Sequence, residues 1–557
     1  MRHLLATALA LSLAAPVGAQ APAFSVRAQD RLAQGTAALW TDLDASGLAD
    51  LVFANGQQAH TLYLQTSPGF FELGGIDLGA SQLTDGVFAD LDGDGDRDFL
   101  HGSLSGSVYL ENTGGTLVPA ALPGFTGLSD VRTVDAVDVD GDGRLDVFAG
   151  TRFGRANVLL LQTETGWQSA EGDLVEDEVT TNAACWGDAD DDGDLDVYLA
   201  NSGGTPDRLY RNDGGGSFSA RNLTLNPEDA STSCVWGDAD GDLDLDLFVT
   251  AANGRRSRLF LNSDGALSLA GTDVFPDVRA DLFNASWADL DNDGDMDLVA
   301  VGRDEPVRAF IWDAGRFQQD ELLLPAGFAT AAALYDYDHD GDLDMALSVG
   351  DSARDEPNLI ARNDLPAGTR WIDVALRGTA SNGEGVGASV TAYLRGADGL
   401  RALRQTMLAH TSRRTQSNTE LHFGLGDAVL DSVAVRWPTG ARDVYTDLAE
   451  GDRAVLMERT GVDAARAPRA AGLSLDVWPN PVRETLRAAL WSGADGLASV
   501  EVVDVLGRRV RYQTHLLRAG VRAGLEIDLG ELAPGVYVVR GRQAGASVSS
   551  RVTLTGR

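Results

Sequence analysis

The chain contains no lysine, so all 44 of its basic residues are arginines. They face 83 acidic residues, and the formal net charge is −39 at pH 7. Proteins that bind nucleic acid need a basic surface to neutralise phosphates. The strong acidic excess therefore argues against nucleic acid as a partner.

Long hydrophobic runs are also missing. After the first residues no stretch approaches the ~20 apolar residues of a transmembrane helix, so no transmembrane segment is expected. Residues 1–20 have the form of a secretory signal peptide: Arg2 and His3, an apolar core from Leu4 to Ala15, then small residues. This predicts a secreted protein that works where calcium is abundant.

Aspartate is plentiful, and much of it falls in seven loops of the form D-x-D-x-D-G-x-x-D. They begin at residues 42, 90, 138, 188, 238, 289 and 336. Carboxylates at positions 1, 3, 5 and 9 supply hard oxygen ligands, and the glycine at position 6 permits a sharp turn. This donor set suits Ca²⁺ better than a transition metal. The loops predict up to seven calcium ions.

The predicted ligands are Asp42, Asp44, Ser46 and Asp50; Asp90, Asp92, Asp94 and Asp98; Asp138, Asp140, Asp142 and Asp146; Asp188, Asp190, Asp192 and Asp196; Asp238, Asp240, Asp242 and Asp246; Asp289, Asp291, Asp293 and Asp297; Asp336, Asp338, Asp340 and Asp344.

Two of the loops depart from the pattern. In the first loop Ser46 replaces a carboxylate, which predicts weaker binding. In the fifth loop Leu243 replaces the turn glycine, and leucine tolerates a positive φ poorly. The fifth site is therefore expected to be strained, remodelled or empty, and to be the weakest of the seven.

The regular spacing of the loops indicates a repeat architecture. Each repeat has room for four short strands, as in Val87–Ala89 before a loop and Leu145–Ala149 after one. Four strands per repeat and seven repeats predict a seven-bladed β-propeller over residues 21–365. The seventh repeat lacks a fourth strand, and residues 21–27 are predicted to supply it and to close the ring.

These loops resemble FG-GAP/VCBS repeats, best known from integrin α-subunit propellers. The resemblance implies that each Ca²⁺ sits in the turn between the first two strands of a blade. The two cysteines, Cys185 and Cys234, precede the loops of adjacent repeats. They are either joined between neighbouring blades or, as we favour from sequence, two separate small buried residues on inner strands.

After the repeats, residues 369–458 read as short strands broken by glycine turns, which predicts a small β-sandwich-like domain. The motifs Gly385-Val386-Gly387-Ala388 and His422-Phe423-Gly424-Leu425-Gly426 resemble the ASPIC/UnbV domain of cartilage acidic protein relatives. His422 is interpreted as a hydrogen-bonded structural histidine rather than a catalytic one, because no nucleophile or carboxylate partner is identifiable.

Residues 459–472 are predicted to be a linker. Residues 473–557 follow, with Trp478-Pro479-Asn480-Pro481 and Leu532-Ala533-Pro534-Gly535-Val536-Tyr537. This segment resembles the C-terminal sorting domain of type IX secretion cargo, with Trp478 in place of the usual tyrosine. The resemblance implies an Ig-like β-sandwich, handling by the type IX machinery and a place at the outer surface of a Gram-negative bacterium.

The sequence carries no H-E-x-x-H, G-x-S-x-G or Walker motif, so an enzyme is not favoured. The favoured function is a calcium-stiffened scaffold that binds an extracellular protein or glycan in adhesion. The alternatives are a structural surface-layer component and a calcium-dependent polysaccharide-active enzyme, a lyase or glycosidase. Acids outside the repeat pattern, Glu164, Asp207 and Glu305, would be its catalytic candidates, although nothing in the sequence marks them.

Overall fold

The computed structural model describes residue 22 and residues 24–555, apart from 31–34, 56–59, 80–82, 222–229, 264, 323, 325, 351–356, 367, 397–398, 418–419, 460–472, 479–481, 483–484, 493–495, 505–507, 518–522, 531 and 544–545. The described chain is almost entirely β-structure, with one short helix, α1 (Asp173–Glu176). The expected all-β class is confirmed. The predicted signal peptide (1–20) and most of the predicted linker lie outside the described residues.

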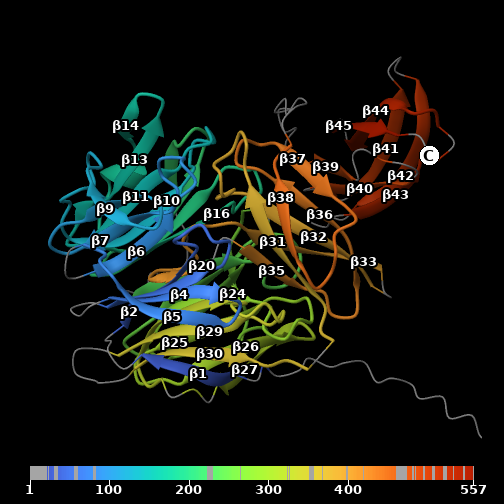
Figure 1. The fold of residues 1–557 in the computed structure, drawn as a ribbon. Helices are drawn as coiled ribbons and strands as arrows, with labels where there is room; N and C mark the ends of the chain where they lie inside the picture. The colour runs from blue at the N-terminus through green and yellow to red at the C-terminus, as the bar shows by residue number, and fades with distance from the viewer. Residues whose placement is uncertain are drawn as a thin grey trace, which may run out of the picture.

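Seven sheets of the repeat region form a ring of blades (Figure 1). The first strands are β2 (Gly35–Thr41), β6 (Leu83–Ala89), β10 (Val131–Val137), β16 (Thr181–Gly187), β20 (Ser231–Gly237), β24 (Leu282–Ala288) and β28 (Ala329–Tyr335). Each contacts the first strand of the next blade, and β28 contacts β2. The first strands therefore encircle a central channel.

The other strands of each blade follow outward in antiparallel order. The second strands are β3 (Asp50–Asn55), β7 (Asp98–Ser103), β11 (Asp146–Thr151), β17 (Asp196–Asn201), β21 (Asp246–Ala251), β25 (Asp297–Gly302) and β29 (Asp344–Val349). The third are β4 (His60–Ser67), β8 (Val108–Asn112), β13 (Val158–Thr163), β18 (Arg208–Asn212), β22 (Arg258–Leu261), β26 (Val307–Asp313) and β30 (Asn358–Asn363). The fourth are β5 (Phe70–Ile76), β9 (Leu117–Ala120), β14 (Gly166–Ser169), β19 (Phe218–Arg221), β23 (Ser268–Leu269) and β27 (Arg316–Leu322). Two further short strands, β12 (Arg155–Ala156) and β15 (Glu178–Val179), pair with each other between the third and fourth blades.

Small residues let neighbouring blades approach closely. A Cβ added to Gly187 would lie 2.8 Å from the Trp236 ring, and one added to Gly237 would lie 2.6 Å from the Trp287 ring. Blade interfaces are therefore packed as densely as a protein core, with aromatic rings of one blade against the backbone of the previous one.

The seventh blade is completed by the N-terminal strand β1 (Phe24–Asp30), which pairs antiparallel with β30 from Phe24↔Asn363 to Asp30↔Asn358 (Figure 1). Phe24 and Val26 pack against the core of the seventh blade. The prediction that the N-terminal segment supplies the missing strand is confirmed. It covers β30, which would otherwise be an exposed edge.

A second domain contains two sheets, β35-β31-β38 and β33-β32-β36-β37, around one apolar core. Its strands are β31 (Trp371–Arg377), β32 (Ser389–Gly396), β33 (Gly399–Thr406), β35 (Glu420–Gly424), β36 (Val429–Arg436), β37 (Arg442–Tyr445) and β38 (Arg453–Met457). Figure 1 shows it in orange between the propeller and the third domain.

One segment of the second domain enters the propeller channel. The short strand β34 (Thr415–Gln416) pairs in parallel with Ala38 and Leu39 of the first blade. The Gln416 side chain exchanges two hydrogen bonds, each 2.8 Å long, with the backbone of Phe88 in the second blade. We call residues 407–417 the channel segment.

The third domain pairs two sheets, β39-β40-β43 and β42-β41-β44-β45, over a shared apolar core. The strands are β39 (Leu473–Trp478), β40 (Thr485–Ser492), β41 (Gly496–Asp504), β42 (Arg509–Leu517), β43 (Ala523–Asp528), β44 (Gly535–Gln543) and β45 (Ala546–Leu554). This is a β-sandwich, and its Ig-like character stays a prediction. Among the described residues no helix is long and apolar enough to cross a membrane.

Candidate metal sites

Each aspartate loop connects the first and second strands of a blade, and its position-9 aspartate is the first residue of the second strand. All seven loops therefore lie at the same end of the propeller. The position-6 N–H donates to a carboxylate oxygen of position 1 in every loop, at 2.8–3.1 Å. This bond folds the loop around its own first aspartate.

The loops bring carboxylates together. Oxygens of Asp42, Asp44 and Asp50 lie within 4.8 Å of one another, as do those of Asp138, Asp140 and Asp146 and of Asp238, Asp240 and Asp246. In two other loops the group is formed by positions 1, 3 and 5: Asp90, Asp92 and Asp94, and Asp188, Asp190 and Asp192. Positions 1 and 3 belong to all five groups, and either position 5 or position 9 completes each.

In the sixth loop the N–H of Asp293 donates to Asp289 at 3.2 Å and to Asp291 at 3.3 Å. In the seventh the N–H of Asp340 donates to Asp336 at 3.2 Å. The predicted ligands of these two loops are therefore also drawn toward one point.

Position 4 was missed by the sequence reasoning. It has a positive φ in every loop, as position 6 does: Gly93, Gly141 and Gly241 in three loops, and Ala45, Asp191, Asn292 and His339 in the others. The signal was present, since glycine, asparagine and aspartate are the residues that best tolerate this conformation. Two left-handed residues explain how nine residues wrap a single point.

The position-9 aspartates are buried and tie each loop to its blade. One oxygen accepts the N–H of position 2, and the other accepts an N–H at the end of the third strand. For Asp246 these donors are Ala239 and Asn262, each at 2.8 Å. All seven loops repeat the arrangement at 2.7–3.3 Å. These oxygens keep a second lone pair for a cation, except Oδ2 of Asp98, which also accepts the Tyr109 hydroxyl at 2.9 Å.

Burial makes these carboxylates poor anions without a counter-charge. It raises the pKa of Asp138 to about 7 and that of Asp146 to about 8, and the neighbouring loop carboxylates add to both. In the fifth loop burial raises the pKa of Asp246 to about 9. Asp188, Asp238 and Asp338 each have a buried oxygen that accepts no hydrogen bond within the described residues. A hard cation fits this donor set and would satisfy these oxygens.

The fifth loop is strained as expected. Leu243 has φ 77°, so it takes up the left-handed turn that glycine occupies elsewhere. Its N–H still reaches Asp238 at 3.1 Å, and its carbonyl accepts a hydrogen bond of 2.9 Å from Arg404 of the second domain. The second domain therefore helps to hold a backbone conformation that the leucine itself disfavours.

A link between consecutive blades was also missed. An asparagine at the end of the third strand donates to the position-2 carbonyl in the loop of the preceding blade. The side-chain amide of Asn112 donates to the Leu43 carbonyl at 3.0 Å, and that of Asn262 donates to the Ala189 carbonyl at 2.7 Å. Gln65 reaches Tyr337 at 2.5 Å and so joins the first blade to the seventh. The recurring Asn or Gln some 15 residues after position 9 was the available signal.

The second domain lies on the loop face of the ring. Arg436 contacts Asp188 at 3.1 Å, and Arg401 donates to the Asp293 carbonyl at 2.8 Å. His422 is hydrogen-bonded as expected, through Nδ1 to Asp373 at 2.7 Å and through Nε2 to Asn292 of the sixth loop at 2.6 Å. Its carboxylate partner Asp373 was not recognisable from sequence. The loops are therefore also the surface on which the second domain sits.

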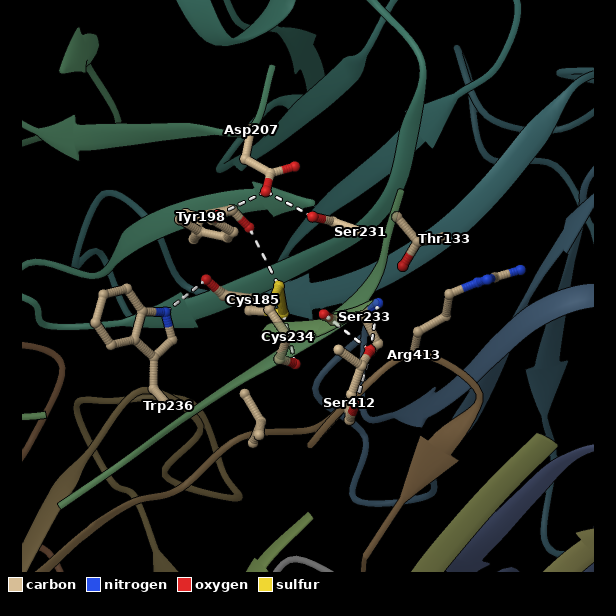
Figure 2. Close-up of a disulfide and its surroundings, with 12 residues drawn as sticks. Thr133, Cys185, Tyr198, Asp207, Ser231, Ser233, Cys234, Trp236, Ser412 and Arg413 are labelled. Carbon is tan, nitrogen blue, oxygen red and sulfur yellow. Dashed lines mark hydrogen bonds between the residues drawn. A yellow bond between two sulfur atoms is a disulfide. The ribbon is translucent and has the colours of Figure 1, made fainter. Parts of the chain in front are cut away.

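The favoured interpretation of the cysteines was wrong. Cys185 and Cys234 are joined in a disulfide, with their Cα atoms 5.9 Å apart (Figure 2). Both are buried on first strands, as expected, but β16 and β20 lie side by side and hold the two Cα atoms within the disulfide range. Spacing along the sequence could not supply that distance.

The acids considered as catalytic candidates lie apart from one another. Asp207 accepts hydrogen bonds from Tyr198 at 2.9 Å and Ser231 at 2.6 Å (Figure 2), and it pairs with Arg258. Glu305 pairs with Arg308 at 2.6 Å. Glu164 is exposed on the turn between β13 and β14. Asp207 and Glu305 thus have structural partners.

At the centre of the ring the channel segment carries a buried ion triad. His410 lies with Nδ1 2.9 Å from Asp135 and Nε2 3.3 Å from Asp85, residues of the third and second blades. Burial alone would lower the pKa of His410, but the two carboxylates outweigh it and raise the pKa to about 10. The histidine is therefore a cation at neutral pH that joins two blades to the second domain.

Protein-family models match three parts of the chain. The FG-GAP-like repeat matches residues 42–101, 90–149, 188–249, 244–300 and 289–347. The ASPIC and UnbV model matches residues 378–462, and the secretion system C-terminal sorting domain matches residues 476–555. No curated protein matches the chain.

Similar solved structures include an Agrocybe aegerita lectin described as recognising non-reducing terminal N-acetylglucosamine. It is 20% identical over 52% of this chain and 80% of that one, with a TM-score of 0.39. Others are BBS1N in complex with ARL6DN (13% identical, 62% and 98% covered, TM-score 0.44) and YCF48 bound to D1 peptide (11%, 64% and 99%, TM-score 0.40). Nothing about the function of this chain follows from similarities at this level.

The ring of repeats, the repeated aspartate loops and the sorting domain define a secreted or cell-surface β-propeller protein of a Gram-negative bacterium, handled by the type IX secretion system. Within that class, the chain is an FG-GAP-repeat protein with an ASPIC/UnbV domain and a C-terminal secretion sorting domain.

Proposed function

We propose that this protein is a calcium-binding scaffold that binds an extracellular protein or glycan at the outer cell surface, and that it is not an enzyme. One observation carries the calcium assignment: the loops group buried carboxylates, and Oδ1 of Asp188 and of Asp238 receives no hydrogen bond from the part of the chain that the structure describes. Oxygen-only ligands in a flexible loop favour Ca²⁺ over transition metals.

The ions would act on the scaffold in two ways. Each would cancel repulsion between carboxylates of one loop and so stiffen a blade edge. Each would also fix the loop surface on which Arg401 and Arg436 of the second domain rest. This leaves the opposite end of the ring as a rigid face for ligand recognition, where loops between blades provide variable surface.

Thermal unfolding with Ca²⁺ and with EGTA, together with metal counting after dialysis, tests the proposal. We expect about five to seven bound ions, with the first and fifth loops weakest. Each site would contribute about 2.7 kcal/mol when free Ca²⁺ is 100 times its Kd. Absence of both bound metal and a melting shift would refute the calcium assignment.

A matched pair of variants in the second loop sharpens the test. Asp92→Ala removes a predicted ligand, whereas Asp96→Ala removes the same charge from a side chain that accepts the Gly114 N–H instead. We expect one fewer ion only for Asp92→Ala. Equal loss in both variants would mean that net charge, and not ligation, governs binding.

A further inference from the structure

The end of the channel opposite the aspartate loops carries a group of arginines. Arg132 is near the start of β10 and Arg152 directly follows β11. First strands run toward the loops and second strands run back, so both residues lie at the far end. Arg413 and Arg414, in the channel segment, reach the same region, since the N–H of Arg414 donates to Asp85 at 2.8 Å near the start of β6.

An open pocket of about 660 Å³ lies there, within the usual size range of small-molecule sites. Arg132 and Arg152 line it together with Thr180, Asn182 and residues 202–205. The lining is thus rich in hydroxyl, amide and backbone hydrogen-bonding groups.

The aromatic residue Phe153 also lines this pocket. Phe153 is 69% exposed and has φ 62°, a conformation that is unusual for a bulky residue. The Arg152 guanidinium lies 4.6 Å from its ring centroid. An exposed aromatic ring held in a strained conformation is more typical of a ligand site than of a structural turn.

The positive charge at this end of the channel is poorly matched by the protein. Nε of Arg132, which lines the pocket, has no hydrogen-bond acceptor among the described residues. The same holds for Nε and Nη2 of the neighbouring Arg413, which is 5% exposed and lies behind the lining. Burial, Arg414 and Arg152 lower the pKa of Arg132 to about 9, so it stays charged at neutral pH. The nearby Asp85 carboxylate is already engaged by His410 and Thr133. Buried guanidinium groups without an acceptor are costly unless an anion supplies one.

We propose that this pocket binds a sugar that bears an anionic group, a carboxylate or a sulfate. Guanidinium groups bind such oxyanions through paired hydrogen bonds. The hydroxyl and amide groups of Thr180 and Asn182 suit sugar hydroxyls, and the Phe153 ring offers an apolar surface for a sugar ring. The proposal rests on the glycan-binding function proposed above and assigns it a site and a ligand class. Glu178, the one carboxylate in the lining, would disfavour a second anionic group.

Binding of the mature protein to immobilised uronate-bearing, sulfated and neutral glycans, in Ca²⁺-containing buffer, tests the proposal. Isothermal titration of the strongest binder follows, with Arg132→Gln/Arg152→Gln as the pocket variant. Arg279→Gln, an exposed arginine of another blade, is the matched control. We expect binding of acidic glycans that is at least tenfold weaker in the pocket variant and unchanged in the control. The uronate and sulfate arms show which anion is preferred.

If the arginines had only a structural role, the pocket variant would melt at a lower temperature, whereas a ligand-binding role predicts no such fall. The pocket variant removes like charges, so its melting temperature should not fall. If it fails to fold, Arg152→Gln alone and the salt dependence of wild-type binding replace it, because an ionic contact must weaken as NaCl rises. Acidic glycans that do not bind, or that bind the variant equally, would overturn the pocket. Binding of neutral glycans or proteins alone would leave the scaffold function standing, and the Ca²⁺ test remains independent.

Discussion

Replacing His410 with leucine should strongly destabilise the propeller. The change keeps side-chain volume but removes the cation that contacts both Asp85 and Asp135, which are 0% and 2% exposed. Removing one partner of a buried ion group costs about 3–5 kcal/mol, because the remaining charges stay buried. For a propeller of about 345 residues that corresponds to a fall in melting temperature of roughly 4–7 °C. Differential scanning calorimetry in saturating Ca²⁺ measures it, with His515→Leu in the third domain as control.

The same triad fixes the sign of a pH dependence. The folded-state pKa of His410, about 10, is above the usual histidine value of 6.5. Its contribution to stability is therefore fully present below pH 6.5 and is lost as the pH rises through about 10. The difference between wild type and His410→Leu should shrink between pH 7 and pH 10.5. A difference below about 1 kcal/mol at pH 7, or one that is constant with pH, would refute the charged triad.

Three further changes test the ring. Deleting residues 22–30 removes β1 and exposes the edge of β30, and it should cost about 3–5 kcal/mol from lost pairing and apolar burial, seen as a lower melting temperature. Replacing Cys185 and Cys234 by alanine opens a cross-link that spans 49 residues and should cost about 2–4 kcal/mol by urea unfolding. Asn262→Ala leaves two buried carbonyls without a donor and should cost about 1–3 kcal/mol, measured in the same way.

Each of these has its own contrary outcome. An unchanged melting curve after deletion would mean that β1 does not close the ring. Equal stability of the alanine double variant and the oxidised wild type would mean that the disulfide does not stabilise the propeller. For Asn262 the comparison is Ser268→Ala, an exposed site on the same blade; similar effects of both changes would mean that the inter-blade link is not important.

The features that sequence predicted are those with a local or repeated pattern. The loops repeat a nine-residue pattern, and the absence of a fourth strand in the last repeat pointed to β1. The strain at Leu243 followed from one residue in a known turn. In each case the residue types and their spacing were enough to define the geometry.

What sequence did not predict depends on distances between remote segments. Thr415 and Gln416 pair with Ala38 and Leu39 across almost the whole length of the propeller, and no periodicity marks them. The arginine pocket forms only where the third and fourth blades meet. The disulfide requires two first strands to pack closely. The separation of 49 residues along the sequence does not give the distance between those strands.

The position of β1 has a consequence for how the protein is made. Ser25 and Asp364 hydrogen-bond to each other across 339 positions of sequence, so the ring cannot close until almost all of the propeller has been synthesised. Contacts between such remote segments slow folding. Until then β30 and the last blade remain open edges, which are prone to pair with other chains. Folding intermediates of this protein should therefore depend on chaperones during export far more than the finished ring does.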